Sequence, residues 1–293
     1  HGGAVQLLNY GICTAMALDP MEKKPLYHFY PGRSILSVGT WGCNLKCPYC
    51  QNWSISQGEI RGDYWEPEEL VNWAKEQASI GIAYTYSEPL MWYEYVLKTA
   101  QLAQEAGLVN VLVTNGFVNK EPWQELLPFI QAINLDLKGF NPQFYRKVLQ
   151  GELRTILQNI AIARDYCHLE LTNLIIPGVN DDLQVIQKLI NWIHTHLGPD
   201  QPLHFSRYYP AYNYQVPATP KETLIRAWSL AQEQLHYVYI GNLDYPPGAQ
   251  TYCPQCGQVV ISRQNMVVVD QALEGQSCRY CGYPIMIIDQ GDP

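Results

Sequence analysis

The stretch Cys-Asn-Leu-Lys-Cys-Pro-Tyr-Cys, residues 43–50, places three cysteines in one short loop directly after a strand-like run at 35–40. An odd number of neighbouring thiols cannot all close into disulfides, so the CxxxCxxC spacing indicates a metal site. A structural zinc site needs a fourth Cys or His nearby, and the next one downstream is Cys167. Three thiolates can instead hold three corners of a 4Fe–4S cluster and leave one iron open to another ligand. We therefore predict an iron–sulfur cluster on Cys43, Cys47 and Cys50, with buried structural cysteines or an adventitious metal site as the alternative.

The composition limits the class of protein. The chain has 293 residues, of which 47% are hydrophobic and 16% charged, enough for one large α/β domain with an appendage. Its formal net charge of −8 argues against nucleic acid as the main partner, because phosphate binding requires a basic surface. No apolar run is long enough to span a bilayer, and no signal peptide is visible. Most of the nine cysteines stand in metal-type spacings, so we expect a protein of the reducing cytoplasm without a membrane partner.

Strand-like and helix-like segments alternate between the cysteine loop and residue 243. Strand-like runs lie near 35–40, 82–86, 109–114, 132–137, 169–176, 202–208 and 237–240. Helix-like segments lie near 67–79, up to 105, 120–130, 152–166, 183–197 and up to 235, the last predicted to begin with a capping box at 219–222. Such alternation predicts a parallel sheet with covering helices. About six units is fewer than the eight of a closed barrel, and the loops after the strands should surround the site.

After a Pro- and Gly-containing linker at 244–248 the sequence changes character. Two CxxCG turns, Cys253/Cys256 and Cys278/Cys281, stand 21 residues apart. Each such turn makes a metal knuckle, and two complete a tetrahedral four-cysteine site. A tail this small has almost no core without the metal. We predict a zinc site, with a rubredoxin-like iron or an auxiliary iron–sulfur cluster as alternatives, on a tail that covers one end of the sheet or presents a docking face.

Polar residues follow successive strands. Ser87 and Glu88 offer a hydroxyl and a carboxylate that suit an ammonium group, although Glu88 could instead cap the next helix. Asn115 follows the third strand. Asp136 and Lys138 end the fourth strand on one face, because side chains alternate along a strand. Two opposite charges turned inward must pair or meet a charged ligand, whereas a solvated edge pair is the alternative.

The cysteine loop, with an aromatic residue before its last cysteine, resembles the signature of the radical S-adenosylmethionine (SAM) superfamily. Over nearly the whole chain the sequence resembles a pyruvate formate-lyase-activase-like branch, the radical SAM member of the AmmeMemoRadiSam system, through segments 17–32, 84–89, 136–139, 176–181, 237–242 and 251–254. The resemblance implies an α/β fold, a partial (β/α)6 TIM-like barrel with a small C-terminal four-cysteine, zinc-ribbon-like appendage. The expected boundaries are an N-terminal flank at 1–34, a core domain at 35–245 and a metal-binding tail at 246–293.

The same resemblance implies the cofactors. In the superfamily the open iron binds SAM, and one electron from the cluster breaks its C–S bond, giving methionine and a 5′-deoxyadenosyl radical that abstracts hydrogen. The expected cofactors are a 4Fe–4S cluster, SAM and Zn²⁺. The residues expected at SAM are Tyr49, Ser87, Glu88, Asn115, Asp136, Lys138 and His204, of which Tyr49 could instead be core and His204 a hydrogen-bonded structural residue.

These features predict an enzyme that cleaves SAM and abstracts hydrogen from an unidentified substrate, a polypeptide or a small molecule. The narrower alternative is a glycyl-radical-enzyme activase. A second alternative is a non-catalytic iron–sulfur and zinc module for electron transfer or scaffolding, which has no need of charged groups at successive strand ends. Expected partners are a flavodoxin-like or ferredoxin-like electron donor and either a protein or peptide substrate or Memo-like and Amme-type proteins.

Overall fold

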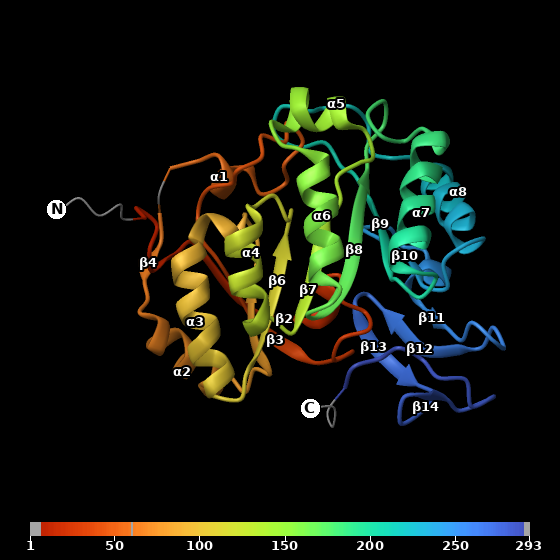
Figure 1. Ribbon diagram of the computed structural model, residues 1–293. Coiled ribbons are helices and arrows are strands. Elements are labelled where there is room, and N and C mark those ends of the chain that lie inside the picture. The colour runs from red at the N-terminus through yellow and green to blue at the C-terminus, as the bar shows by residue number, and fades with distance from the viewer. Residues whose placement is uncertain (1–6, 60, 290–293) are drawn as a thin grey trace.

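The protein is described by a computed structural model covering residues 7–59 and 61–289, so that 1–6 of the predicted flank and 290–293 of the tail lie outside it. Within these residues, eight strands form one sheet in the order β10-β9-β8-β7-β6-β5-β3-β2 (Figure 1). The sheet is parallel except for β2, which pairs antiparallel with β3. Its strands are β2 (Ala15–Pro20), β3 (Ser34–Gly39), β5 (Gly81–Tyr84), β6 (Val109–Thr114), β7 (Ala132–Asp136), β8 (His168–Ile175), β9 (Leu203–Arg207) and β10 (Val238–Gly241).

Helices connect consecutive parallel strands, which are also neighbours in the sheet. Right-handed crossovers between such neighbours place all the helices on one face. The helices on this face are α2 (Pro67–Glu76), α3 (Tyr93–Glu105), α4 (Lys120–Leu126), α6 (Leu153–Ala163), α7 (Leu183–Leu197) and α8 (Lys221–Gln232). Shorter helical turns in the described chain are α1 (Trp53–Ser56), α5 (Pro142–Phe144), the π-helical η4 (Tyr145–Leu149) and the 3-10 turns η1 (Met21–Lys23), η2 (Pro89–Trp92), η3 (Leu127–Phe129) and η5 (Pro246–Ala249). None of the helices in the described ranges is long and apolar enough to cross a membrane.

The observed order confirms the partial barrel of βα units expected from the sequence. One local prediction was wrong, because the N-cap of α8 is Pro220 and makes no side-chain capping bond. The Thr219 hydroxyl instead donates to the carbonyl of Ile175 (2.6 Å) and accepts from the backbone N–H of Tyr208 (3.2 Å). The hydroxyl is therefore used to join the loops after β8 and β9.

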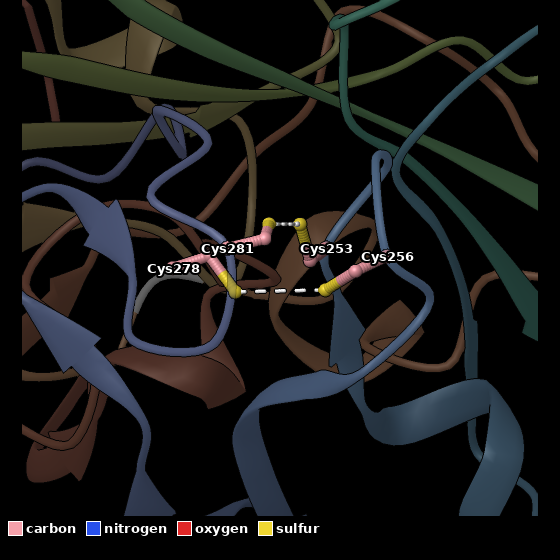
Figure 2. Close-up of side chains that lie close together, drawn as sticks. All are labelled: Cys253, Cys256, Cys278 and Cys281. Atoms are coloured by element: carbon pink, nitrogen blue, oxygen red, sulfur yellow. Dashed lines mark hydrogen bonds between the residues drawn. The ribbon is translucent and has the colours of Figure 1, made fainter.

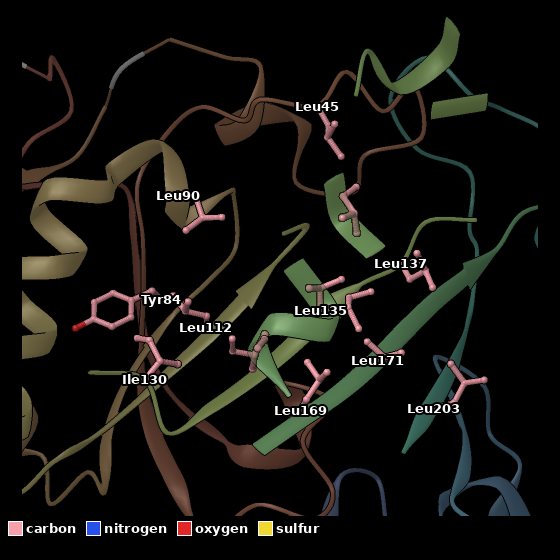
Figure 3. Close-up of a cluster of buried hydrophobic side chains, with 14 of the residues drawn as sticks. Leu45, Tyr84, Leu90, Leu112, Ile130, Leu135, Leu137, Leu169, Leu171 and Leu203 are labelled. Atoms are coloured by element: carbon pink, nitrogen blue, oxygen red, sulfur yellow. The ribbon is translucent and has the colours of Figure 1, made fainter. Parts of the chain in front are cut away.

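The main hydrophobic core lies between the sheet and the helices. Strand residues such as Tyr84, Leu112, Leu135 and Leu171 are fully buried there, as Figure 3 shows. Leu45 of the cysteine loop belongs to the same core. The loop is therefore attached to the fold by apolar burial as well as by its position after β3.

The opposite face of the sheet, called here the inner face, is covered at its N-terminal end by the chain's own N-terminal segment. Met21, Leu26 and Phe29 are buried against Ile35 and its neighbours on β5, β6 and β7. Because Pro20 pairs with Ser34 at the start of β3, this segment lies at the end of the strands opposite the cysteine loop. The N-terminal segment thus contributes a strand to the sheet and part of the core.

The C-terminal tail lies below the same end of the sheet (Figure 1). It forms a three-stranded sheet of β11 (Thr251–Tyr252), β12 (Val259–Gln264) and β13 (Val267–Gln271), and a small hairpin of β14 (Leu273–Glu274) and β15 (Ser277–Cys278); β1 (Ile12–Cys13) and β4 (Asp63–Tyr64) pair elsewhere. Its buried residues form one cluster with Tyr27 and with Tyr237 and Tyr239 at β10. The tail therefore covers this end of the barrel, and a docking face for a partner stays a prediction.

Candidate functional site

The cysteine loop, residues 43–50, is held from two sides at the C-terminal end of β3. The backbone N–H of Lys46 donates to the carbonyl of Leu149 at the end of η4 (2.8 Å). The backbone N–H of Asn213, in the loop after β9, donates to the carbonyl of Pro48 (2.9 Å). Segments that follow the fourth and sixth parallel strands therefore fix the loop over the mouth of the partial barrel.

The three loop cysteines are free thiols in a partly buried environment that contains hydrogen-bond donors. Cys43 Sγ lies 3.4 Å from the backbone N of Leu45 and 3.8 Å from Nδ2 of Asn115. Cys50 Sγ lies 3.2 Å from the hydroxyl of Ser56. Burial, and next the Glu88 carboxylate, raise the pKa of the Cys43 thiol to about 12. A thiolate here needs a positive partner, and a cluster of iron ions would supply one, so the donor set fits a metal cluster.

Asp136 and Lys138 lie on the inner face beside these cysteines, as strand alternation predicted. Lys138 Nζ is 2.8 Å from a carboxylate oxygen of Asp136, and their side chains keep 19% and 35% of their surface exposed. Burial lowers the pKa of Lys138, but Asp136 and then the Cys47 and Cys43 thiols raise it more, so the pKa lies above its ordinary value. The ammonium group is therefore charged, close to two of the cysteines and partly open to a ligand.

Glu88 is committed to bonds within the protein. One carboxylate oxygen accepts from the backbone N–H of Leu90 at the start of η2 (3.1 Å) and from the hydroxyl of Thr114 (2.6 Å). The other accepts from the backbone N–H of Asn115 (2.9 Å). Burial raises the pKa of Glu88 to about 7 although these bonds lower it. The capping role left open by the sequence is observed, and Glu88 also ties the end of β6 to the turn after β5.

Ser87 and Tyr49 also lie at this end of the sheet. The Ser87 hydroxyl donates to the carbonyl of Thr40, just before the cysteine loop. Tyr49 is 3% exposed and stacks on Phe144 at 6.5 Å between ring centroids. A hollow of about 380 Å³ opens beside it, and its lining combines three aromatic rings with apolar and polar residues: Pro48, Tyr49, Asn141, Gln143, Phe144, Lys147, Val148, Gly178, Val179 and Tyr214. An aromatic-walled hollow of this kind suits a planar ring.

His204 lies elsewhere. It is on the inner face but buried at the N-terminal end, with Nε2 2.6 Å from Glu170 and its ring stacked on Tyr239. Glu170 is also bonded to His168 (3.0 Å). The structure thus brings Tyr49, Ser87, Glu88, Asn115, Asp136 and Lys138 around the cysteine loop but not His204, which matches the structural alternative.

Three residues of this region were not singled out from the sequence. Ser56 contacts Cys50, Asn44 contacts Asn115 (2.8 Å), and the Tyr145 hydroxyl accepts from the backbone N–H of Lys138 (2.9 Å). Asn44 stands inside the cysteine motif, which was a usable signal. Ser56 and Tyr145 meet the site only through the fold, so nothing in their local sequence indicates them.

The tail contains a separate cluster of four cysteines. Cys253, Cys256, Cys278 and Cys281 have sulfur atoms all within 4.8 Å of one another, with two pairs at 3.6 and 3.7 Å (Figure 2). A tetrahedral ion with metal–sulfur bonds of about 2.3 Å holds its sulfurs about 3.8 Å apart. Burial raises the pKa of Cys278. Hydrogen bonds from the backbone N–H groups of Tyr280 and Cys281 and from neighbouring thiols lower this pKa by more, so that it is about 7. The four thiols are spaced for one four-coordinate ion rather than for a larger cluster.

Residues 38–190, which run from the end of β3 into α7, match the sequence profile of the radical SAM superfamily. The chain belongs to the radical SAM superfamily. Membership implies an enzyme with a 4Fe–4S cluster and SAM, and the cysteine loop lies inside the matched region.

Several known proteins are similar to this chain to different degrees. An uncharacterized protein of Methanocaldococcus jannaschii is 42% identical over 98% of this chain and 87% of that protein. The (2S)-3-sulfopropanediol dehydratase activating enzyme of Klebsiella oxytoca is 28% identical over 55% of this chain and 47% of that enzyme, so this chain spans about half the length of that relative. The structure of Streptococcus suis SuiB bound to S-adenosylmethionine shares the fold, with a TM-score of 0.57 and 12% identity over 73% of this chain and 51% of that one. This radical SAM protein is thus related to glycyl-radical activating enzymes.

Proposed function

We propose that the protein reductively cleaves SAM and uses the resulting radical to abstract hydrogen from a substrate held over the mouth of the partial barrel. When bound, the 4Fe–4S cluster and SAM would supply the one-electron cleavage of a C–S bond that yields methionine and a 5′-deoxyadenosyl radical. The observation that carries the proposal is the meeting of three free cysteines with the charged Lys138–Asp136 pair at one end of the sheet.

Different residues of the site would bind the cluster, the charged groups of SAM and a planar ring. Cys43, Cys47 and Cys50 would hold three irons of the cluster. Lys138 and Asp136 would bind the oppositely charged carboxylate and amino groups of SAM, because charge-assisted hydrogen bonds are the stronger ones. Tyr49 and the hollow beside it would hold a planar ring and exclude water from the radical.

The substrate class follows from the relatives. Because the K. oxytoca protein is an activating enzyme, we propose a polypeptide substrate and a one-electron protein donor of the flavodoxin or ferredoxin type. Activation of a glycyl-radical enzyme is the second candidate, favoured by that same similarity. The similarity of the whole sequence to the radical SAM member of the AmmeMemoRadiSam system favours a partner from that system instead. The metal-type cysteine spacings and free thiols support a reducing, cytoplasmic setting.

The tail site is proposed to hold Zn²⁺. Its four thiolates leave no open coordination position, so the ion would stabilise the fold and take no part in the reaction. Buried tail residues pack with Tyr27 of the N-terminal segment and with Tyr237 and Tyr239 at β10, which supports a structural role.

The proposal is tested with protein reconstituted anaerobically with iron and sulfide. Dithionite-reduced wild type should release 5′-deoxyadenosine from SAM, and Cys47→Ala should abolish this release and lower the iron content. Cys167→Ala, at a half-buried cysteine outside the loop, is the matched control and should retain both. Lys138→Met should weaken SAM binding by on the order of 1.5–3 kcal/mol, the range for a hydrogen bond to a charged group. Iron-loaded wild type that binds SAM but never releases 5′-deoxyadenosine would contradict the proposal.

A further inference from the structure

Asn115 was expected to contact SAM, but its side chain is already occupied by the protein. Its Oδ1 accepts from the backbone N–H of Phe117 (2.8 Å), and its Nδ2 donates to Oδ1 of Asn44 (2.8 Å). Asn44 in turn donates from Nδ2 to the carbonyl of Phe117 (2.6 Å). This ring of bonds fixes which end of each amide is nitrogen, since a flipped Asn115 would turn its amide nitrogen toward the N–H of Phe117.

The fixed amide places its N–H beside a cluster ligand. Nδ2 of Asn115 lies 3.8 Å from Cys43 Sγ, and the backbone N of Leu45 lies 3.4 Å from the same sulfur. The backbone N–H of Asn115 is bonded to the buried Glu88 carboxylate, and Asn115 itself is only 4% exposed. An amide this constrained cannot turn toward a ligand in the hollow without breaking bonds at both of its ends.

We propose that Asn115 is a positioning residue for the cluster: it holds Cys43 in place and raises the reduction potential of the cluster through an N–H···S hydrogen bond. Hydrogen bonds to cluster sulfurs set the potential, because each stabilises the more negative, reduced state more than the oxidised one. Removing the donor should make the cluster harder to reduce. This inference rests on the proposed function, since it requires a cluster on the cysteine loop.

Asn159 provides a matched control. It is buried to the same degree and donates from Nδ2 to the carbonyls of Gly116 (2.9 Å) and Val118 (2.8 Å). It therefore supports the same turn after β6 as Asn115 does, but no hydrogen bond joins it to a cysteine sulfur in the described structure. Asn159→Leu disturbs the turn while leaving the donor at Cys43 in place.

The experiment is a redox titration of the reconstituted proteins without SAM, followed by the electron paramagnetic resonance signal of the reduced cluster. Iron content and SAM affinity of the oxidised proteins are measured in parallel. We expect Asn115→Leu and Asn115→Asp to shift the midpoint potential to more negative values while SAM affinity changes by less than about twofold. Asn159→Leu should keep the wild-type potential. If neither Asn115 variant takes up iron while Asn159→Leu does, with melting temperatures preserved, the positioning role is supported directly.

Two results would overturn the inference. One is an unchanged potential in fully loaded Asn115→Leu, above all if SAM affinity falls about tenfold, which would restore Asn115 as a SAM contact. The other is an equal shift in Asn159→Leu, which would trace the effect to a disturbed turn. A wild type that takes up no iron, or that takes up iron and never cleaves SAM, refutes the proposed function and is recognised before any variant is compared.

Discussion

Replacing Arg263 with alanine should destabilise the whole chain, although this residue belongs to the C-terminal tail. Arg263 lies on β12 and is only 2% exposed. Its guanidinium donates to the carbonyl of Tyr27 (2.7 Å) and to the hydroxyl of Thr251 (2.8 Å), and lies 3.4 Å from a carboxylate oxygen of Glu22. It also covers the Tyr27 ring at 4.3 Å from the centroid. A tail residue thus neutralises the Glu22 carboxylate and donates a hydrogen bond to the Tyr27 carbonyl, both in the N-terminal segment.

The size of the destabilisation follows from the groups that Arg263→Ala leaves without a partner. Glu22 is fully buried, and its second carboxylate oxygen already has no partner among the described residues. Removing one partner of a buried pair costs about 3–5 kcal/mol, because the remaining charge is uncompensated. With an unfolding entropy of about 2.1 cal/mol/K per residue, a chain of this length should lose about 5–8 °C in melting temperature. Burial raises the pKa of Glu22 above its ordinary value, so the loss should be largest at neutral pH and shrink as acid protonates Glu22.

The assay is thermal and denaturant unfolding of metal-loaded wild type, Arg263→Ala and the control Arg279→Ala, an exposed arginine of the same tail. The control should stay within about 0.5 kcal/mol of wild type, as exposed positions usually do. A double variant, Glu22→Leu with Arg263→Met, should recover much of the loss, since apolar residues can replace a buried ion pair at little cost. Two results would refute the view that the tail and the N-terminal segment form one core. One is a decrease of less than about 1 kcal/mol in the free energy of unfolding for Arg263→Ala. The other is a double variant whose decrease in that free energy exceeds the sum of the two single decreases.

Two further predictions concern the same end of the molecule. The tail should bind one zinc ion per chain, and Cys256→Ser should lower both the zinc content and the melting temperature of the whole protein. The control Cys167→Ser should leave both quantities unchanged. Iron at this site by elemental analysis would favour the rubredoxin-like or auxiliary-cluster alternative. Burial raises the pKa of Glu170, but hydrogen bonds from His168 and His204 lower it more, to well below its ordinary value, so its contribution to stability is present above about pH 4–5 and is lost as the pH falls further. Glu170→Gln should therefore flatten the acid side of the stability profile, and equal slopes in variant and wild type would show that this carboxylate is not the ionised group.

Much of the barrel could be predicted because its signals are local. The structure reproduces the strand predicted near 35–40, observed as Ser34–Gly39, the helix beginning with Pro67 and the helix ending at Leu197. The capping box at Thr219 failed because its hydroxyl has partners on two other loops, which a four-residue pattern cannot contain. The strand Ala15–Pro20 was missed because only one of its residues is buried.

The candidate site divides in the same way. Spacing alone grouped Cys43, Cys47 and Cys50, and strand alternation paired Asp136 with Lys138, since both rules act over a few residues. Glu88 caps its own turn, as the sequence allowed. Its bond to Asn115, the bond of Asn115 to Asn44 and that of His204 to Glu170 join different strands or loops, so they could not be inferred from the local sequence. The local sequence around a polar residue at a strand end is similar whether its side chain contacts a ligand or a neighbouring loop.

The amino-acid sequence by itself determined the chemistry available to this protein: which thiols can share a metal, which strands follow one another, and which family the cysteine loop belongs to. Tertiary structure alone decided which polar groups remain free. A carboxylate or amide that finds a donor across the sheet, as Glu88 and Asn115 do, is satisfied there, because leaving it buried and unpaired costs more than the bond contributes. Only the fold decides whether the segment at 17–32 and the metal-binding tail are appendages or parts of the core. Their burial depends on long-range contacts such as Arg263 with Glu22, 241 residues apart in the chain.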